Sequence, residues 1–341
     1  CVITSGKVKC WGFGNQNQLL VPEIKNPRML ALGSGHSCAV GDEGLVCWGR
    51  KRSYLNADDV MAFVGGVAAP PKLETVSLYD YFKRPRPVVI EEKGPLDYAD
   101  DLPVLRAVTQ SGVVISTGST HSCYLKTGVI ECFGDRDAGQ TTVPALTNPR
   151  QVSTGFDFSC AIADEGVVCW GDNSRNQANA PFTINPIQIA TGGRHACLLD
   201  GATVDCWGWN FNGQTDVPST LRNPRQVTAG LYHSCALDDD GVHCWGSNAY
   251  GQTDVPELVN PKYLSSGLGN HNCVVDDTGV VCWGDDEHSQ AQALPLVRPT
   301  DVSVGYEHTC ALDDSGVQCW GKNSQGQLDV PVLDNPKQVS V

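Results

Sequence analysis

Sixteen cysteines carry the clearest chemistry in this chain, because they come in pairs nine positions apart. Thiols pair as disulfides or bind zinc, but zinc ligands usually come in tight Cys-x-x-Cys pairs. The spacing therefore favours eight disulfides and no metal. The expected pairs are Cys1–Cys10, Cys38–Cys47, Cys123–Cys132, Cys160–Cys169, Cys197–Cys206, Cys235–Cys244, Cys273–Cys282 and Cys310–Cys319.

The residues between two paired cysteines predict a β-hairpin. Between Cys235 and Cys244 the chain reads Ala-Leu, then Asp-Asp-Asp-Gly, then Val-His, which is two short strands around a turn that ends in glycine. With the turn at 238–241, Leu237 faces Val242 and the two cysteines face each other on the same side. Opposed residues in a hairpin lie about 4.5–5.5 Å apart at Cα, within disulfide range.

Histidines and aspartates are the other candidates for chemistry. Six histidines stand two positions before a first cysteine, namely His36, His121, His195, His233, His271 and His308. Histidines gathered in a ring could form a metal site. A histidine that recurs at the same place in the repeat is more simply a packing residue of the repeated fold. The Asp runs fall at the hairpin turns, where Asp is a common turn residue, and they lack the spacing of a calcium loop. We therefore predict no metal and no cofactor, with calcium at the turns as the alternative.

These elements must be positioned by a repeat of about 37 residues. After each Trp-Gly come a Gln seven positions beyond the Trp, a Val-Pro step, an Asn-Pro step and a short β-branched strand. Three or four short strands per unit predict an all-β propeller of eight blades, with seven as the alternative. The last residues, 335–341, supply the strand that the first hairpin lacks, so the N- and C-terminal strands should close the ring. Residues 1–341 then form one domain.

The repeat also resembles that of a known family. The pattern Gly-x-x-His-Ser-Cys-Ala-Leu…Gly-Val-x-Cys-Trp-Gly-x-Asn-x-x-Gly-Gln is similar to the repeat of the regulator of chromosome condensation family. Short units and paired cysteines look closer to its secreted bacterial members, such as the β-lactamase inhibitory propeller. The resemblance implies a propeller, commonly of seven blades, and covers the chain apart from residues 50–102.

Composition limits the classes of partner and the compartment in which the protein can work. The net charge of −14 disfavours nucleic acid and anionic membranes. No apolar run approaches the roughly 20 residues that span a bilayer, so no membrane insertion is expected. Two cysteines per unit predict an oxidising compartment, which makes the chain extracellular, cell-surface or periplasmic. The repeat requires Cys1 to pair with Cys10, so we expect a disulfide there and not a lipid anchor.

Residues 50–102 interrupt the second repeat as an insertion. It carries a basic and aromatic run that includes Tyr79, Tyr81, Phe82 and Arg84. It is too short for a core of its own, so it should pack on the ring or on a partner. Because it directly follows Trp48-Gly49, it should emerge on the face formed by the loops after each Trp-Gly.

We expect that face to bind. Strands alternate in direction, so the loops before each His and after each Trp-Gly share one face, which we name the loop face; the Asp turns lie on the opposite turn face. Aromatic and Arg residues are enriched at binding hot spots. The loop-face candidates are Trp209, Phe211, Tyr232, Tyr250 and Tyr306, with Phe13 and Phe156, and the insertion adds Tyr79, Tyr81, Phe82 and Arg84.

No nucleophile elbow, phosphate loop or His-Glu-x-x-His motif is present, so we predict no enzyme. The sequence instead favours an extracellular, non-enzymatic binding module that recognises a protein partner as an adhesin, inhibitor or assembly component. The alternative is a lectin that stacks sugars on the loop-face aromatics. A hydrolase or lyase working in the central channel is the third hypothesis.

Overall fold

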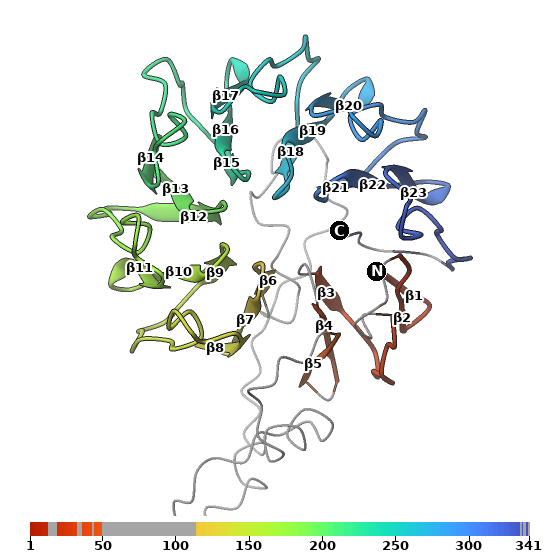
Figure 1. Ribbon diagram of the computed structural model, residues 1–341, viewed down its shortest axis with the longest axis horizontal. Helices are drawn as coiled ribbons and strands as arrows, with labels where there is room; N and C mark the ends of the chain where they lie inside the picture. Colours follow the sequence, from red (N-terminus) through yellow and green to blue (C-terminus); the bar gives the residue numbers. More distant parts are fainter. Residues whose placement is uncertain are drawn as a thin grey trace, which may run out of the picture.

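A computed structural model describes residues 1–12, 19–32, 36–42, 44–49, 114–334, 336 and 339. Over these ranges the chain is all-β, and its strands form eight small sheets arranged around a common centre (Figure 1). In the same ranges, no helix is long and apolar enough to cross a membrane. The predicted insertion, with Tyr79, Tyr81, Phe82 and Arg84, lies outside the described residues, as does Phe13.

Each sheet is one blade, and the strands follow one another within it. Blade 1 holds β1 (Val2–Thr4) and β2 (Lys7–Lys9). Blades 2 to 4 hold β3 (Met29–Leu32), β4 (His36–Gly41) and β5 (Gly44–Gly49); β6 (Val114–Thr117), β7 (His121–Lys126) and β8 (Val129–Gly134); β9 (Gln151–Thr154), β10 (Phe158–Ala163) and β11 (Gly166–Gly171). Blades 5 and 6 hold β12 (Pro186–Thr191), β13 (His195–Asp200) and β14 (Thr203–Gly208); β15 (Gln226–Ala229), β16 (His233–Asp238) and β17 (Gly241–Gly246). Blades 7 and 8 hold β18 (Tyr263–Ser266), β19 (His271–Asp276) and β20 (Gly279–Gly284); β21 (Asp301–Val304), β22 (His308–Asp313) and β23 (Gly316–Gly321).

The hairpin register follows from the sequence pattern. In blade 6, Cys235 pairs with Cys244 and Leu237 with Val242, as predicted. The strands run one residue farther than expected, which leaves only Asp239 and Asp240 in the turn. The first strand of each three-stranded blade lies nearest the centre of the ring (Figure 1).

All eight predicted disulfides are present, and no cysteine is free. Each joins directly opposed residues of one hairpin; for Cys235 and Cys244 the Cα atoms are 4.1 Å apart. The first cysteine of the pair is fully buried in blades 2 to 8. The disulfides therefore close short local loops inside the core.

Replacing Cys235 and Cys244 together with Ala should lower the free energy of unfolding by about 3 kcal/mol, because the cross-link restricts a ten-residue loop in the unfolded chain. Urea unfolding followed by tryptophan fluorescence measures this change. In a reducing buffer, which opens the disulfide in both proteins, the difference should shrink toward the packing contribution of the two side chains. Equal stability of both proteins under oxidising conditions would contradict the prediction.

Among the described residues, the hydrophobic core forms eight clusters, one at each junction between neighbouring blades. One cluster joins Leu237 and Val242 of blade 6 to Leu264 and Trp283 of blade 7. Another joins Val2 of blade 1, Cys310 of blade 8 and Val339 near the C-terminus. Val339 also bridges Val2 in antiparallel pairing, so the C-terminal segment completes blade 1. The predictions of eight blades and of closure by both terminal strands are confirmed.

Polar side chains form hydrogen bonds between the inner strands of neighbouring blades. The Gln226 side chain of β15 donates to the carbonyl of Leu264 in β18 (2.7 Å) and accepts from its N–H (3.0 Å). Gln151 of β9 makes the same pair of bonds to Ile189 of β12. Each amide satisfies both backbone groups of one residue on the facing strand, so the inner strands are held together without a shared β-ladder.

Candidate functional site

The repeated histidines join neighbouring blades. Four of them stand first in the second strand of their blade, and their Nε2 atom meets a hydroxyl or amide oxygen of the following blade. The bonds are His121–Ser159 (2.7 Å), His195–Ser234 (2.9 Å), His233–Asn272 (2.7 Å) and His271–Thr309 (2.8 Å). Across the described ranges, no three His, Cys, Asp or Glu side chains gather as a metal site. These histidines therefore act in the architecture of the ring.

Blade 4 replaces this bond with an apolar contact. Phe158 stands where the other blades have His, and Ala196 of blade 5 stands where they have Ser, Thr or Asn. Both side chains are fully buried in one core cluster. A phenyl ring facing a hydroxyl would leave that hydroxyl short of a partner, so the two positions change together.

The Gln seven positions after each Trp organises the loop that follows. The Gln214 side-chain oxygen accepts the backbone N–H of Asn212 (2.9 Å), which tightens the turn. Its own carbonyl accepts the indole N–H of Trp245 in the next blade (3.0 Å). The same indole bond recurs from Trp11, Trp170, Trp207, Trp283 and Trp320. The repeated Gln thus bonds the backbone of its own loop through its side chain and the indole of the next blade through its carbonyl.

On the turn face, the aspartates accept hydrogen bonds from backbone N–H groups. Asp276 accepts the N–H groups of Val259 (2.9 Å), Thr278 (2.7 Å) and Gly279 (3.1 Å). Burial disfavours its charged form, but these bonds and the Thr278 hydroxyl outweigh it and lower the pKa of Asp276. Asp313 has the same arrangement. These oxygens serve the turn, as predicted.

In four of the Asn-Pro steps, at Asn26, Asn148, Asn223 and Asn260, the Asn side chain bonds an Asp side chain of the hairpin turn. The left-handed conformation of the Asn (φ 48° at Asn223) aims the side-chain amide at this Asp. Asn223 donates to Asp239 at 2.7 Å, and Asn148 donates to Asp164 at 2.6 Å. Where the seventh repeat has Arg298 instead of Asn, the ion pair with Asp314 takes the same place.

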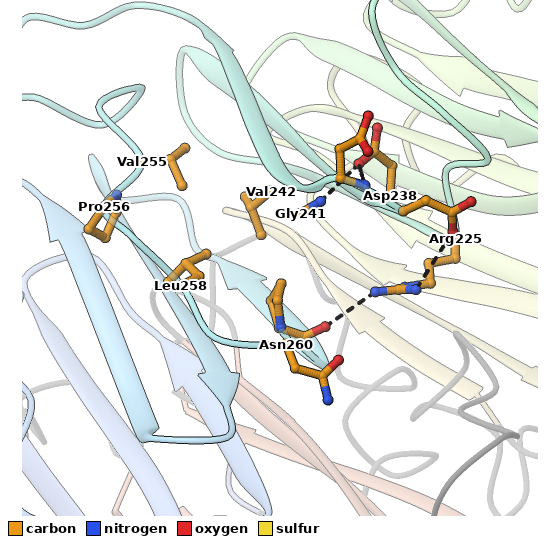
Figure 2. A pocket seen from close by; sticks show the side chains of 11 residues that line it. Arg225, Asp238, Gly241, Val242, Val255, Pro256, Leu258 and Asn260 are labelled. Carbon is orange, nitrogen blue, oxygen red and sulfur yellow. Dashed lines mark hydrogen bonds and ion pairs between the residues drawn. The ribbon is translucent and has the colours of Figure 1, made fainter.

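A hollow of about 450 Å³ opens on the turn face between blades 6 and 7 (Figure 2). Its carboxylates are engaged: Asp239 accepts from Asn223, and Asp240 pairs with Arg222 at 3.1 Å. Arg225 spans the hollow and donates to the carbonyl of Pro261 at 3.3 Å. The charged side chains that line the hollow therefore bond within the protein, and Arg225 connects blade 6 to the segment that leads into blade 7.

The loop face is assembled as the strand directions predict. The N–H of Trp209, after β14, donates to the carbonyl of Arg194, before β13, at 2.9 Å. The N–H of Ser247 donates in the same way to the carbonyl of Tyr232 at 2.9 Å. The loops before each second strand and after each third strand therefore lie side by side.

Three of the predicted aromatic residues meet on this face. Trp209 and Phe211 stack with centroids 6.4 Å apart, and Tyr232 of the next blade meets Trp209 edge-on at 5.3 Å. Arg175 of blade 4 adds a guanidinium 6.0 Å from the Trp209 centroid. Trp209 and Tyr232 are half-buried, whereas Phe211 is 83% exposed. We name Arg175, Trp209, Phe211 and Tyr232 the Trp209 cluster.

The other predicted aromatics stand apart from these ring contacts. Tyr250 is 54% exposed at the position in blade 6 that Arg175 occupies in blade 4. Tyr306 is 60% exposed in blade 8, and Phe156 is half-buried in blade 4. Arg175 was not among the predicted site residues, although its place two residues before the repeated Gln marks it as a loop-face position. The exposed Phe182 and Ile184, on the connector to blade 5, were also missed.

Hydrogen bonds hold the loop that carries Phe211. The Asn210 side chain donates to Asp216 (2.7 Å) and accepts the N–H of Thr215 (2.9 Å). Gln214 holds the N–H of Asn212, and Gly213 supplies the positive φ of 78° that the turn needs. The ring of Phe211 is therefore presented by a loop that is closed on itself at both ends.

Charge is distributed unevenly over the loop face. Arg194 lies close enough to Asp172 to help lower the pKa of that carboxyl, against burial and together with hydrogen bonds from Ser174 and Gln177. Blades 7 and 8 present Asp285, Asp286, Glu287 and Glu307. Glu307 binds Lys322 at 2.5 Å and His288 at 3.5 Å. The loops around the Trp209 cluster thus carry Arg175 and Arg194, whereas the loop after β20 carries three consecutive carboxylates.

Comparison with known proteins agrees with this architecture. The family model for the regulator of chromosome condensation (RCC1) repeat matches residues 150–177, 187–214, 225–252 and 300–327, each running from an inner strand to the repeated Gln. The protein is an RCC1-like repeat propeller. No curated protein matches the propeller by sequence.

Solved structures share the fold at low identity. Prp20p from Saccharomyces cerevisiae is 16% identical over 66% of the propeller and 75% of its own chain, with a TM-score of 0.54. The ectodomain of the Physcomitrella patens receptor kinase CR4 is 22% identical over 87% and 74%, with a TM-score of 0.55. The ectodomain of Arabidopsis thaliana ACR4 is 20% identical over 86% and 97%, with a TM-score of 0.52.

Proposed function

We propose that this propeller is an extracellular, non-enzymatic binding module that recognises a protein partner through the Trp209 cluster. The observation that carries the proposal is the 83% exposed ring of Phe211, stacked on Trp209 and held on a hydrogen-bonded loop. Pre-organised aromatic side chains bind with little loss of conformational entropy. Eight disulfides support an oxidising compartment.

Two further observations support binding over catalysis. The buried histidines and turn aspartates already make the hydrogen bonds of the ring, so they are committed to structure. Among the structural neighbours, Prp20p is described as binding Gsp1p and histones, and two others are receptor-kinase ectodomains. A propeller that presents loops to a protein is consistent with both kinds of neighbour, although the fold alone does not specify a partner.

Replacing Phe211 and Trp209 together with Ala should weaken partner binding by at least about 100-fold, since truncation of a hot-spot aromatic costs roughly 2 kcal/mol or more. The partner is first captured from cell-surface and secreted material, and its affinity is then measured by surface plasmon resonance. Phe182→Ala, which removes an exposed aromatic ring on the connector to blade 5, is the control and should bind normally.

A form lacking residues 51–101 tests the predicted role of the insertion in the same assay. Unchanged affinity of the Trp209 and Phe211 variant would refute the proposed site. If the captured material is carbohydrate and free sugar competes with it, the lectin alternative is correct.

A further inference from the structure

Arg175 occupies an unusual place in the Trp209 cluster. Its backbone N–H is held by the Gln177 side chain at 2.8 Å, which fixes the loop after β11. Its exposed side chain crosses to the next blade, where the guanidinium lies over the Trp209 ring. No ion pair joins Arg175 to the part of the chain that the structure describes, whereas Lys322 on the same face is paired with Glu307. Within the described part of the chain, Arg175 is thus an exposed cation positioned by Trp209 and without a carboxylate partner.

A guanidinium held beside an indole ring is well suited to bind a carboxylate. The aromatic contact limits the freedom of the side chain and leaves the planar fork of N–H donors available. That fork matches a carboxylate, which accepts two parallel charge-assisted hydrogen bonds. Arg194 is the next loop-face cation, and it is shared with Asp172. An incoming carboxylate would therefore be favoured at Arg175.

Phe211 determines what should accompany the carboxylate. Its exposed ring stacks on the same indole that Arg175 lies over, so one Trp side chain links an exposed apolar ring and a cation. Resting on the proposed function, we propose that the Trp209 cluster binds a protein segment with an Asp or Glu side chain next to an aromatic or aliphatic one. The carboxylate contacts Arg175, and the apolar side chain packs on Phe211 and the edge of Trp209.

Charge complementarity selects the same segment. The consecutive acidic residues Asp285, Asp286 and Glu287 of blade 7 repel an acidic ligand from that loop. An acidic segment is therefore favoured at Arg175 over the loop of blade 7. An acidic carbohydrate would satisfy Arg175 but would need an open ring face to stack on. The indole already has Arg175 at 6.0 Å and Phe211 at 6.4 Å, and Phe211 projects outward, which favours a protein.

The test uses the whole propeller, tetramerised to raise avidity, to select from a yeast-displayed library of short random peptides. The selected peptides should be enriched in Asp or Glu adjacent to Phe, Tyr, Trp or Leu. Arg175→Gln should weaken their binding by about tenfold or more, and Arg175→Lys should recover only part of the loss. Arg136→Gln, an exposed guanidinium in the equivalent loop of blade 3, is the matched control and should bind normally. Higher salt should also weaken binding.

Two results would overturn the inference. One is selection of peptides without acidic residues, or with affinity that Arg175→Gln leaves unchanged. The other is binding of acidic glycans on an array, abolished by Arg175→Gln, with no acidic peptides selected. A partner that is lost with Trp209→Ala but unaffected by Arg175→Gln would refute carboxylate recognition while leaving the proposed function intact. A partner unaffected by both substitutions would refute the proposed function itself.

Discussion

Lowering the pH from 7 to 5 should reduce the free energy of unfolding by about 7 kcal/mol, because His195, His233, His271 and His308 stay neutral in the folded ring; burial lowers the pKa of His308 to about 4. Burial lowers the pKa of His195 to about 3, with repulsion from His233 adding to it. Burial lowers the pKa of His233 to about 4 and, with repulsion from His308 and His233, that of His271 to about 3. The ordinary histidine value is 6.5.

The sign follows from proton uptake. Below pH 6.5 the unfolded chain binds protons at these histidines, while the folded chain does not until the pH nears 3 to 4. Stability is therefore complete above pH 6.5 and falls as the pH decreases, by about 1.4 kcal/mol per histidine for each pH unit. Urea unfolding at a series of pH values measures the slope. The lowered pKa of Asp276 and of Asp313 adds a loss only at lower pH.

The chain itself offers the control. Replacing His195 with Phe and Ser234 with Ala copies the Phe158–Ala196 pair that already joins blades 4 and 5. The double variant should fold, and its slope between pH 6 and 4 should be smaller by about one proton, or 1.4 kcal/mol per pH unit. An unchanged slope would mean that His195 is already protonated in the folded protein.

The local structure of each blade could be predicted from the sequence because its determinants are close together. The distance from Cys235 to Cys244 and the Asp-Gly turn define one register, and the Leu237–Val242 pair follows from it. The repeat length then gives the number of blades, and the incomplete first and last units indicate closure. These are short-range patterns, and the strands are too short for an alternative register to bury the same side chains.

Contacts between blades could not be predicted from the sequence, because the two residues of each contact lie about one repeat apart in the chain. His195 meets Ser234 and Arg175 meets Trp209 across blade boundaries, and neither pair can be chosen without the rotation between neighbouring blades. For the same reason Tyr250 was grouped with Trp209 although it belongs to the following loop. Variable loop residues carry no internal pattern, so their grouping emerges only in the assembled ring.

Replacing Gly192 with Ala should lower the free energy of unfolding by about 3 kcal/mol or more, at the upper end for overpacking, because the added methyl group meets backbone atoms. An added Cβ would lie 2.3 Å from the carbonyl oxygen of Gly230 in the next blade and 2.4 Å from Cε1 of His195. Neither group can retreat easily: Gly230 is bonded to Gly193, and His195 to Ser234. The glycine of the Gly-x-x-His pattern is therefore required because two blades approach each other closely beside the imidazole.

Gly128→Ala separates this clash from the backbone cost of losing a glycine. Gly128 has a φ of 78° and no atom within 4 Å of an added Cβ, so its substitution should cost only about 1 kcal/mol. Urea unfolding compares the two variants, and hydrogen exchange shows where the Gly192 variant opens. Because Gly192 lies at the junction of blades 5 and 6, exchange should rise first in β12 and β15, the inner strands on either side. A Gly192 variant as stable as the Gly128 variant would mean that the blades can separate there without cost, and the closed ring would then not be what holds the Trp209 cluster together.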